Sequence, residues 1–158
     1  MKCNKSCICD FSNSFCKIYA QFGTKCSQSI ISLTENKRTY QLENKSHRCI
    51  HSYRIDDGVI TSQNVSKCDY AIFIDTNSLI LIELKGVDIS HAIDQIENTI
   101  NILIQDNKVR VNRIDARIVL SRGPNPKIIA SKQQRLERLL FKYHGHLNYR
   151  EKKLLESI

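Results

Sequence analysis

One short segment in the middle of the chain constrains the fold more than any other. Residues 79–85 read LILIELK and are apolar almost throughout, and glycine follows at position 86. Such a segment is typical of a central strand that is covered on both faces of its sheet. Side chains alternate along a strand, so Glu83 and Lys85 share one face. Charges buried there need a salt-bridge partner or a metal ion, because isolated buried charge is costly.

A second strand directly precedes this segment. Residues 69–74 (DYAIFI) are rich in branched and aromatic side chains, and residues 75–78 (DTNS) have turn chemistry. The sequence therefore predicts a hairpin that returns Asp69 to the side of Glu83. An odd-length loop places these two carboxylates directly opposite each other, whereas a two-residue loop pairs Asp69 with Leu84.

The remaining elements follow from periodicity. Apolar residues recur at three- and four-residue steps from Ile89 to about Gln105, which predicts an amphipathic helix capped by Asp88 or Ser90. A basic amphipathic helix is predicted over residues 131–143. Strands are predicted over residues 39–42, 49–55 and 115–120, with a turn at residues 56–58 (DDG) and a returning partner strand at residues 59–61. Residues 27–33 could form a helix or a strand, and residues 149–158 could add a last short helix.

These elements describe one domain of the α/β class. The chain has 158 residues, which is enough for one sizeable core. We expect a mixed β-sheet flanked by helices over about residues 35–125, a Cys-rich extension over residues 1–30 and C-terminal helices over residues 130–158. No stretch approaches the roughly 20 apolar residues of a membrane span. The first residues lead into polar residues and cysteines rather than an apolar run, so we expect a cytoplasmic protein without a secretory signal.

The charge balance favours a polyanionic partner. Lys and Arg number 24 against 16 acidic residues, which gives a net charge of +8. Binding phosphates with such side chains releases counterions and strengthens the complex. The positive charge is spread along the chain, with mild concentration over residues 108–122 and 127–153. It therefore permits binding to nucleic acid without proving it.

The chain is rich in cysteine near its start. Of seven cysteines, five lie within the first 26 residues: Cys3, Cys7, Cys9, Cys16 and Cys26. Four thiolates can complete a tetrahedral zinc site, but no Cys-x-x-Cys pair occurs here. An odd total also fits poorly with a closed set of disulfides. We therefore favour reduced thiols over structural zinc, and we expect Cys49 and Cys68 to pack as small apolar side chains.

The paired acids of the hairpin suit a specific chemistry. Two carboxylates and a nearby backbone carbonyl supply hard oxygen ligands, which Mg²⁺ and Mn²⁺ prefer. Such an ion polarises a phosphate and lowers the pKa of bound water. Lys85 could orient that water or stabilise charge on the phosphate oxygens. The residues thus indicate metal-dependent hydrolysis of phosphodiester bonds.

The same residues carry a resemblance to a known family. Residues 67–70 (KCDY), a strand hairpin, and residues 82–86 (IELKG) follow one another in that order. This pattern resembles the signature of the PD-(D/E)XK, or restriction-endonuclease-like, phosphodiesterases, with Cys68 in place of the proline. The resemblance covers about residues 40–122, and it includes the downstream helix, where Ala92 and Gln95 match a small residue and a site-facing Gln.

The resemblance implies both a fold and a site. It implies a helix before a restriction-endonuclease-like mixed sheet. Asp69, Glu83 and the carbonyl of Leu84 would bind the metal ion, Lys85 would assist the attack, and Gln95 would orient Lys85 or the phosphate.

Many members of the family also carry an acid on the first helix. Glu43 is our candidate for that acid and Glu35 is the second choice. For contacts to the DNA backbone, which give affinity without reading sequence, we single out basic residues outside the motif. These are Arg110, Arg113, Lys132 and Arg135.

The expected function is cleavage of DNA in repair, recombination or defence. One small domain offers little surface for reading a groove, so we expect a homodimer, or a helicase or defence partner, and no membrane contact. The alternatives are a non-catalytic nucleic-acid-binding or protein-interaction module on the same fold, and an RNA nuclease. In the simplest alternative, Asp69 is a turn residue, Glu83 and Lys85 form a surface ion pair, and Gln95 is solvated. His91, His144 and His146 are interpreted as surface residues.

Overall fold

The computed structural model describes residues 23–24, 28–75, 78–106, 109–122 and 130–158. Its strands are β1 (Gly23–Thr24), β2 (Ile30–Glu35), β3 (Arg38–Glu43), β4 (Ile50–Arg54), β5 (Tyr70–Ile74), β6 (Ser78–Glu83), β7 (Arg113–Leu120), β8 (Leu147–Glu151) and β9 (Lys153–Ser157). Its helices are α2 (Ile89–Ile100), which continues as the π-helical segment η2 (Asn101–Asp106), and α3 (Ala130–Phe141). The five cysteines of the predicted N-terminal extension lie outside the described residues.

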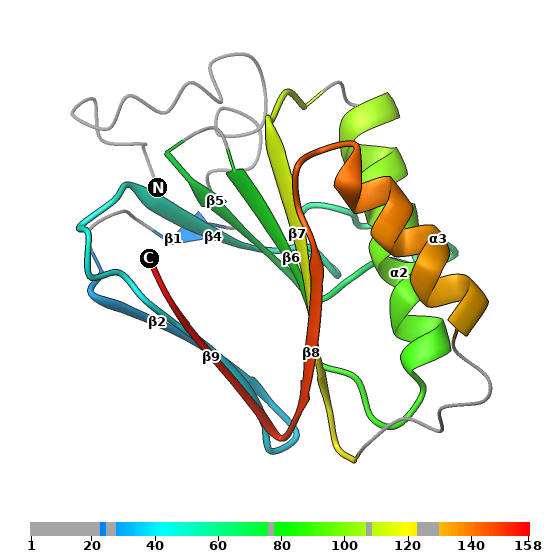
Figure 1. Cartoon of the computed structure of the whole chain (residues 1–158), viewed down its shortest axis with the longest axis horizontal. Helices are drawn as coiled ribbons and strands as arrows, with labels where there is room; N and C mark the ends of the chain where they lie inside the picture. The colour runs from blue at the N-terminus through cyan, green and yellow to red at the C-terminus, as the bar shows by residue number, and fades with distance from the viewer. Residues whose placement is uncertain (1–22, 25–27, 76–77, 107–108, 123–129) are drawn as a thin grey trace.

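Two sheets and two helices form a layered α/β arrangement (Figure 1). The larger sheet has the order β1-β4-β5-β6-β7-β8, with parallel pairing from β6 to β8 and antiparallel pairing elsewhere. The smaller sheet has the order β2-β3-β9, with β9 parallel to β3. Figure 1 shows α2 and α3 over one face of the larger sheet and the smaller sheet on its other side. The mixed sheet with helices was predicted, whereas the smaller sheet was not.

Strand β6 is buried on both of its faces, as its composition predicts. Leu79 and Leu81 belong to the apolar cluster beneath the helices, whereas Ile80 and Ile82 belong to the cluster beneath the smaller sheet. All four side chains are buried. A strand between two covering layers needs apolar residues at consecutive positions, and β6 has them.

The hairpin of β5 and β6 has the register of an odd-length loop. Tyr70 pairs with Ile82, and Ile74 pairs with Ser78. Continuing this register by one residue places Asp69 opposite Glu83. The predicted juxtaposition of the two acids is confirmed.

Helix α2 connects β6 to the parallel strand β7. Asp88 Oδ1 accepts a hydrogen bond from the His91 amide at 3.0 Å, so Asp88 is the N-cap. The helix buries one apolar face, made of Ile89, Ala92, Ile93, Ile96 and Ile100. Because α2 follows β6 directly, its N-terminus lies near the carboxyl end of that strand, where α/β proteins commonly bind ligands.

The predicted C-terminal helix over residues 149–158 is wrong. These residues belong to β8 and β9, which are separated by Lys152 in a left-handed conformation with φ of 59°. Strand β8 pairs with β7, and β9 pairs with β3, so that Tyr40 lies opposite Leu154. Pairing with such distant strands overrides local propensity, and a local pattern cannot reveal it.

The predicted partner strand at residues 59–61 is also wrong. Strand β4 already lies between β1 and β5, so it offers no free edge. The Val59 amide instead donates to the Arg54 carbonyl at 3.1 Å. Gly58 permits this close turn, since a Cβ there would lie 2.2 Å from the Arg54 carbonyl oxygen.

The other predicted elements agree with the structure. Strands β3, β4 and β7 match the predicted strands, α3 matches the basic helix, and β2 resolves the open choice at residues 27–33 in favour of a strand. Within the described residues, no helix is long and apolar enough to cross a membrane.

Candidate active site

Asp69 and Glu83 lie side by side at the open end of the hairpin. The Asp69 amide donates to Glu83 Oε2 at 3.1 Å, and the Leu84 amide donates to Asp69 Oδ2 at 2.7 Å. Each carboxylate is therefore held by the backbone of the neighbouring strand. Both lie on the sheet face that α2 covers, since Ala71 and Leu81, two residues along each strand, pack beneath the helices.

Glu83 is buried and Asp69 is half-buried, and burial makes their negative charge costly. Glu83 is 1% exposed. Burial, followed by the charge of Asp69, raises the pKa of Glu83 to about 9. Burial also raises the pKa of Asp69, although the hydrogen bond from the Leu84 amide opposes this effect. A cation bound between the two carboxylates would favour their ionised forms.

Lys85 lies between this pair and solvent. Its Nζ is 3.8 Å from Glu83 Oε1, and its side chain is 33% exposed. Its charge lowers the pKa of Glu83 and that of Asp69, against the larger effect of burial. The predicted ion pair is thus present, but one partner is buried and the other can be reached from outside.

Of the two candidates for a further acid, Glu35 lies nearer the pair. Glu35 ends β2, and its negative charge raises the pKa values of Asp69 and Glu83. Glu43 ends β3 at the other end of the smaller sheet, where its carboxylate is 3.3 Å from Lys45 Nζ. Glu43 also lies in a strand rather than in a helix. Of the two residues, the structure therefore brings Glu35 rather than Glu43 towards the pair.

Helix α2 holds the segment that leads into the site. Gln95 Nε2 donates to the Lys67 carbonyl at 2.8 Å, and Thr99 Oγ1 accepts from the Cys68 amide at 2.9 Å. Gln95 Oε1 is buried and has no hydrogen-bond partner among the described residues. The hydrogen bond that fixes Gln95 thus goes to the backbone of residue 67 and not to Lys85. Gln95 acts here as a positioning residue.

Lys67 is a buried cation that sequence reasoning missed. Its Nζ donates to the Ser62 carbonyl at 2.6 Å and lies 3.1 Å from Asp56 Oδ1. These contacts fasten the loop after β4 to the segment that enters the site. The available signal was a lysine two residues before Asp69, but its partner Asp56 was interpreted only as a turn residue.

Three of the four basic residues predicted to contact DNA form ion pairs within the protein. Arg110 is exposed and precedes β7. The three pairs are Arg113–Asp115 at 2.6 Å, Lys132–Asp94 at 2.5 Å and Arg135–Glu97 at 2.5 Å. Lys132 and Arg135 therefore fasten α3 to α2, which partly neutralises their charge.

The donor set fits a hard divalent ion in part. Within the described residues, no group of three or more His, Cys, Asp or Glu side chains is arranged to hold a metal ion. Asp69 and Glu83 supply two carboxylates, and each uses only one oxygen in the backbone hydrogen bonds between them. Mg²⁺ is commonly bound through one or two carboxylates, with water completing its shell.

The cysteines and histidines that were predicted to be structural or surface residues have ordinary surroundings. Cys68 is fully buried, and burial raises the pKa of its thiol. Cys49 is half-buried, and its Sγ lies 4.0 Å from His51 Nδ1. His91 and His144 are exposed. His146 Nδ1 lies 2.9 Å from an oxygen of Asp115 on β7. Of these residues, Cys68 adjoins the two acids of the hairpin, since it directly precedes Asp69 and the charges of Glu83 and Asp69 add to the rise in the pKa of its thiol.

Comparison with known proteins found no match to this chain among family models, curated proteins or solved structures.

Proposed function

We propose that this chain hydrolyses phosphodiester bonds in DNA, using a divalent metal ion and a restriction-endonuclease-like fold. One observation carries the proposal: two carboxylates 14 residues apart in sequence, one buried and one half-buried, lie side by side with a lysine at their edge. An apolar strand gains no stability from such acids, and perturbed buried acids are characteristic of functional sites. The hairpin, the following glycine and the helix after it agree with the family resemblance.

The residues of the site have distinct roles in this proposal. Asp69 and Glu83 would hold the ion, and by resemblance the carbonyl of Leu84 would add a ligand. Bound there, Mg²⁺ or Mn²⁺ would supply positive charge that polarises a phosphate and acidifies water. Lys85, which solvent reaches, donates to phosphate oxygens and stabilises the charge that develops on them. Gln95 keeps the backbone at residues 67–68 in place.

A second candidate is a nucleic-acid-binding module without catalysis. Its support is that only two acidic side chains converge among the described residues, while Glu83 retains a proton near neutral pH when no cation is present. In that case the pair is a buried structural contact, and the basic surface alone carries the function.

Cleavage assays on plasmid DNA, branched DNA and single-stranded RNA with Mg²⁺ or Mn²⁺ test the proposal. Glu83→Gln and Lys85→Ala should each lower the rate by about 100-fold or more, since each removes charge stabilisation from the transition state. Glu43→Gln is the matched control and should cleave at the wild-type rate, whereas Glu35→Gln should be slower. If folded wild type cuts none of these substrates and binds no Mg²⁺ in a titration, the binding-module alternative replaces the proposal.

A further inference from the structure

The outward face of α3 carries a row of cations. Lys132, Arg135, Arg138 and Lys142 follow one another at steps of three, three and four residues, so they lie along one side of the helix. Lys132 and Arg135 are paired with acids of α2. Within the described part of the chain, Arg138 and Lys142 form no ion pair. Two positive charges on this face are therefore available to a ligand.

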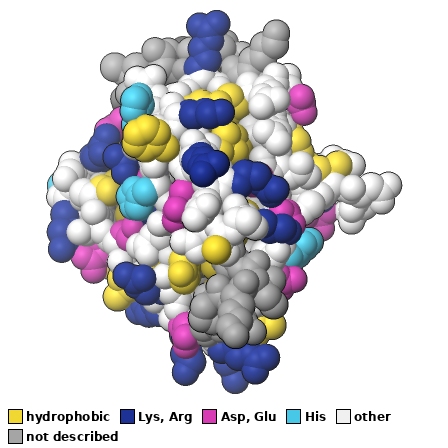
Figure 2. Space-filling view, turned by 45° about the vertical axis from the view of Figure 1, so that its right-hand side comes forward, with side chains coloured by type: hydrophobic (Ala, Val, Ile, Leu, Met, Phe, Trp, Pro, Cys, Tyr) yellow, Lys and Arg dark blue, Asp and Glu magenta, His cyan; other side chains and the backbone are white. Residues whose placement is uncertain are grey.

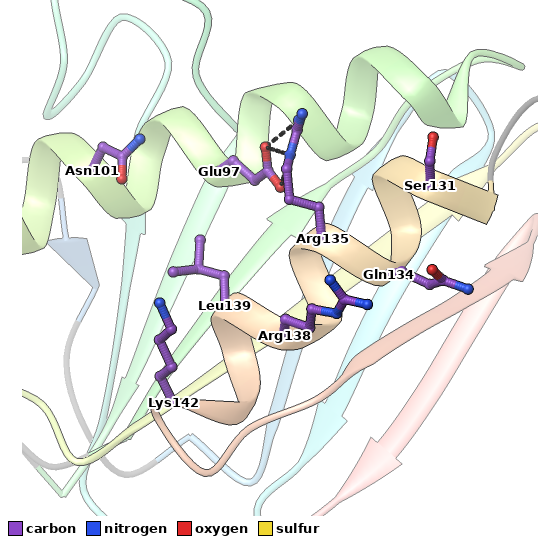
Figure 3. A pocket seen from close by; sticks show the side chains of 8 residues that line it. All are labelled: Glu97, Asn101, Ser131, Gln134, Arg135, Arg138, Leu139 and Lys142. Carbon is purple, nitrogen blue, oxygen red and sulfur yellow. Dashed lines mark hydrogen bonds and ion pairs between the residues drawn. The ribbon is translucent and has the colours of Figure 1, made fainter.

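A groove runs beside these two cations, between α2 and α3 (Figure 3). Its volume is about 490 Å³. Its lining includes three cations, Arg135, Arg138 and Lys142, but only one carboxylate, Glu97. Figure 3 shows that carboxylate bonded to Arg135, which leaves the other two cations facing the groove without an acid. The groove therefore favours a negatively charged ligand.

An exposed aromatic ring lies next to Arg138 on α3. Phe141 is 78% exposed, although α3 buries Leu136 and Leu140 on its opposite side. Arg138 and Phe141 are three residues apart, so the ring lies beside an unpaired cation. Figure 2 shows Lys and Arg side chains gathered on this face of the molecule with apolar side chains among them. Beside cations without ion-pair partners, such a ring offers a base a surface on which to stack.

We propose that the outward face of α3 binds single-stranded nucleic acid, with Arg138 and Lys142 on phosphates and Phe141 stacked on a base. Cations together with an exposed aromatic ring are the combination that single strands recognise. A duplex offers only its phosphates here, because its bases are already stacked on one another. Single strands become the substrate class of the nuclease proposed above, and this part of the inference rests on the proposed function. The binding of single strands to α3 does not depend on catalysis.

Binding is measured by fluorescence anisotropy with labelled oligothymidine, oligouridine and a duplex of equal length, in EDTA so that nothing is cut. Phe141→Ala should weaken binding of the single strands by about tenfold and leave duplex binding nearly unchanged. Arg138→Gln/Lys142→Gln should also weaken binding, and should reduce the slope of log affinity against log salt by about 1.4, because two phosphates are no longer neutralised. The two single strands distinguish DNA from RNA as the natural ligand.

The matched controls lie on the smaller sheet. Lys153 and Leu155 are exposed on β9, so Lys153→Gln and Leu155→Ala should bind like wild type. Wild-type binding by all the folded α3 variants overturns the inference, as does an equal loss in the controls. Binding of anionic lipid vesicles, but of no oligonucleotide, through Phe141 also overturns it.

The test separates this inference from the proposed catalysis. Glu83→Gln should bind the single strands like wild type in EDTA, because it leaves α3 unchanged. If the α3 variants bind normally while Glu83→Gln abolishes cleavage, the inference fails and the nuclease proposal stands. If the α3 variants lose binding while wild type cuts nothing, the inference about α3 stands and the nuclease proposal fails.

Discussion

Glu83 shows how one residue can conflict with the strand that contains it. It shares a buried face with Leu79 and Leu81, where an apolar side chain would be the more stable choice. Instead the position carries a carboxylate whose pKa burial raises to about 9. A residue that breaks a local rule in this way is expected at a functional site.

The raised pKa of Glu83 makes stability depend on pH in a definite direction. The folded protein keeps a proton that the unfolded chain releases above its ordinary pKa of 4.5, so stability falls as the pH rises from 4.5 towards about 9. Without divalent cations, Glu83→Gln should therefore raise the melting temperature at about pH 8 and change it little near pH 5. Each kcal/mol corresponds to about 2–4 °C. A variant that is less stable than wild type at both pH values would contradict this account.

Addition of Mg²⁺ provides a second readout at the same residue. Near pH 8 the ion should raise the melting temperature of the wild type, because it binds the folded state alone. The Glu83→Gln variant should show little or no rise, whereas Glu43→Gln should respond like wild type. Thermal melts of the three proteins with and without Mg²⁺ make this comparison, and an equal rise in all three would place the ion elsewhere.

At the scale of elements, β7 and β9 are joined by charges as well as by packing. Arg117 of β7 is 5% exposed, and its Nε is 2.7 Å from Glu156 of β9. Its neighbour Asp115 bonds to Arg113 and to the His146 amide. Burial alone would raise the pKa of Asp115, but these contacts hold it below its usual value. The cluster links the face of the larger sheet to the smaller one.

Removal of only one partner from this cluster should be more harmful than removal of both. Glu156→Leu removes the nearer carboxylate of the buried Arg117 guanidinium, at 2.7 Å, and leaves Asp115 at 3.7 Å, so it should cost about 3–5 kcal/mol of unfolding free energy. Arg117→Met/Glu156→Leu should recover much of that loss, because no uncompensated charge remains. Urea unfolding of the single and double variants measures the coupling. A double variant as unstable as the single one would mean that packing, and not charge, dominates.

The elements also show which parts of the fold and of the candidate site can be predicted from the sequence. The β5–β6 hairpin and its two acids were predictable, because a turn signal and an alternating pattern lie within a few residues of each other. The choice between Glu35 and Glu43 was not, since it depends on which end of the β2–β3 hairpin lies near β6. The role of Gln95 could not be predicted from the sequence either, because its hydrogen-bond partner is a backbone carbonyl 28 residues earlier.

The whole molecule is built from layers whose strands come from distant parts of the chain. The smaller sheet combines β2 and β3 with β9, and it covers the second apolar cluster of the larger sheet. This layer was absent from the sequence-based prediction, because residues 153–157 mix charged and apolar side chains and show no strand pattern of their own. That segment becomes a strand because it pairs with β3 in the complete fold.

Two neighbouring leucines of β9 test this packing. Leu154 is 1% exposed beneath the smaller sheet, and Leu155 is 60% exposed. Leu154→Ala should lower the unfolding free energy by about 2–5 kcal/mol, since it leaves a cavity in the core. Leu155→Ala should change it by less than about 0.5 kcal/mol. Chemical denaturation of both variants compares the same substitution on the two faces of one strand, and similar losses would refute the described arrangement.

The place of β9 has a consequence for synthesis on the ribosome. Strand β3 is the middle strand of its sheet, yet its partner on one side is made late: the Tyr40 hydroxyl donates to Glu156, 116 residues further along. Until that segment emerges, a nascent chain presents an unpaired strand edge and an uncovered apolar surface, which are the features that drive aggregation. The pairing of β3 is therefore complete only after translation has passed β9.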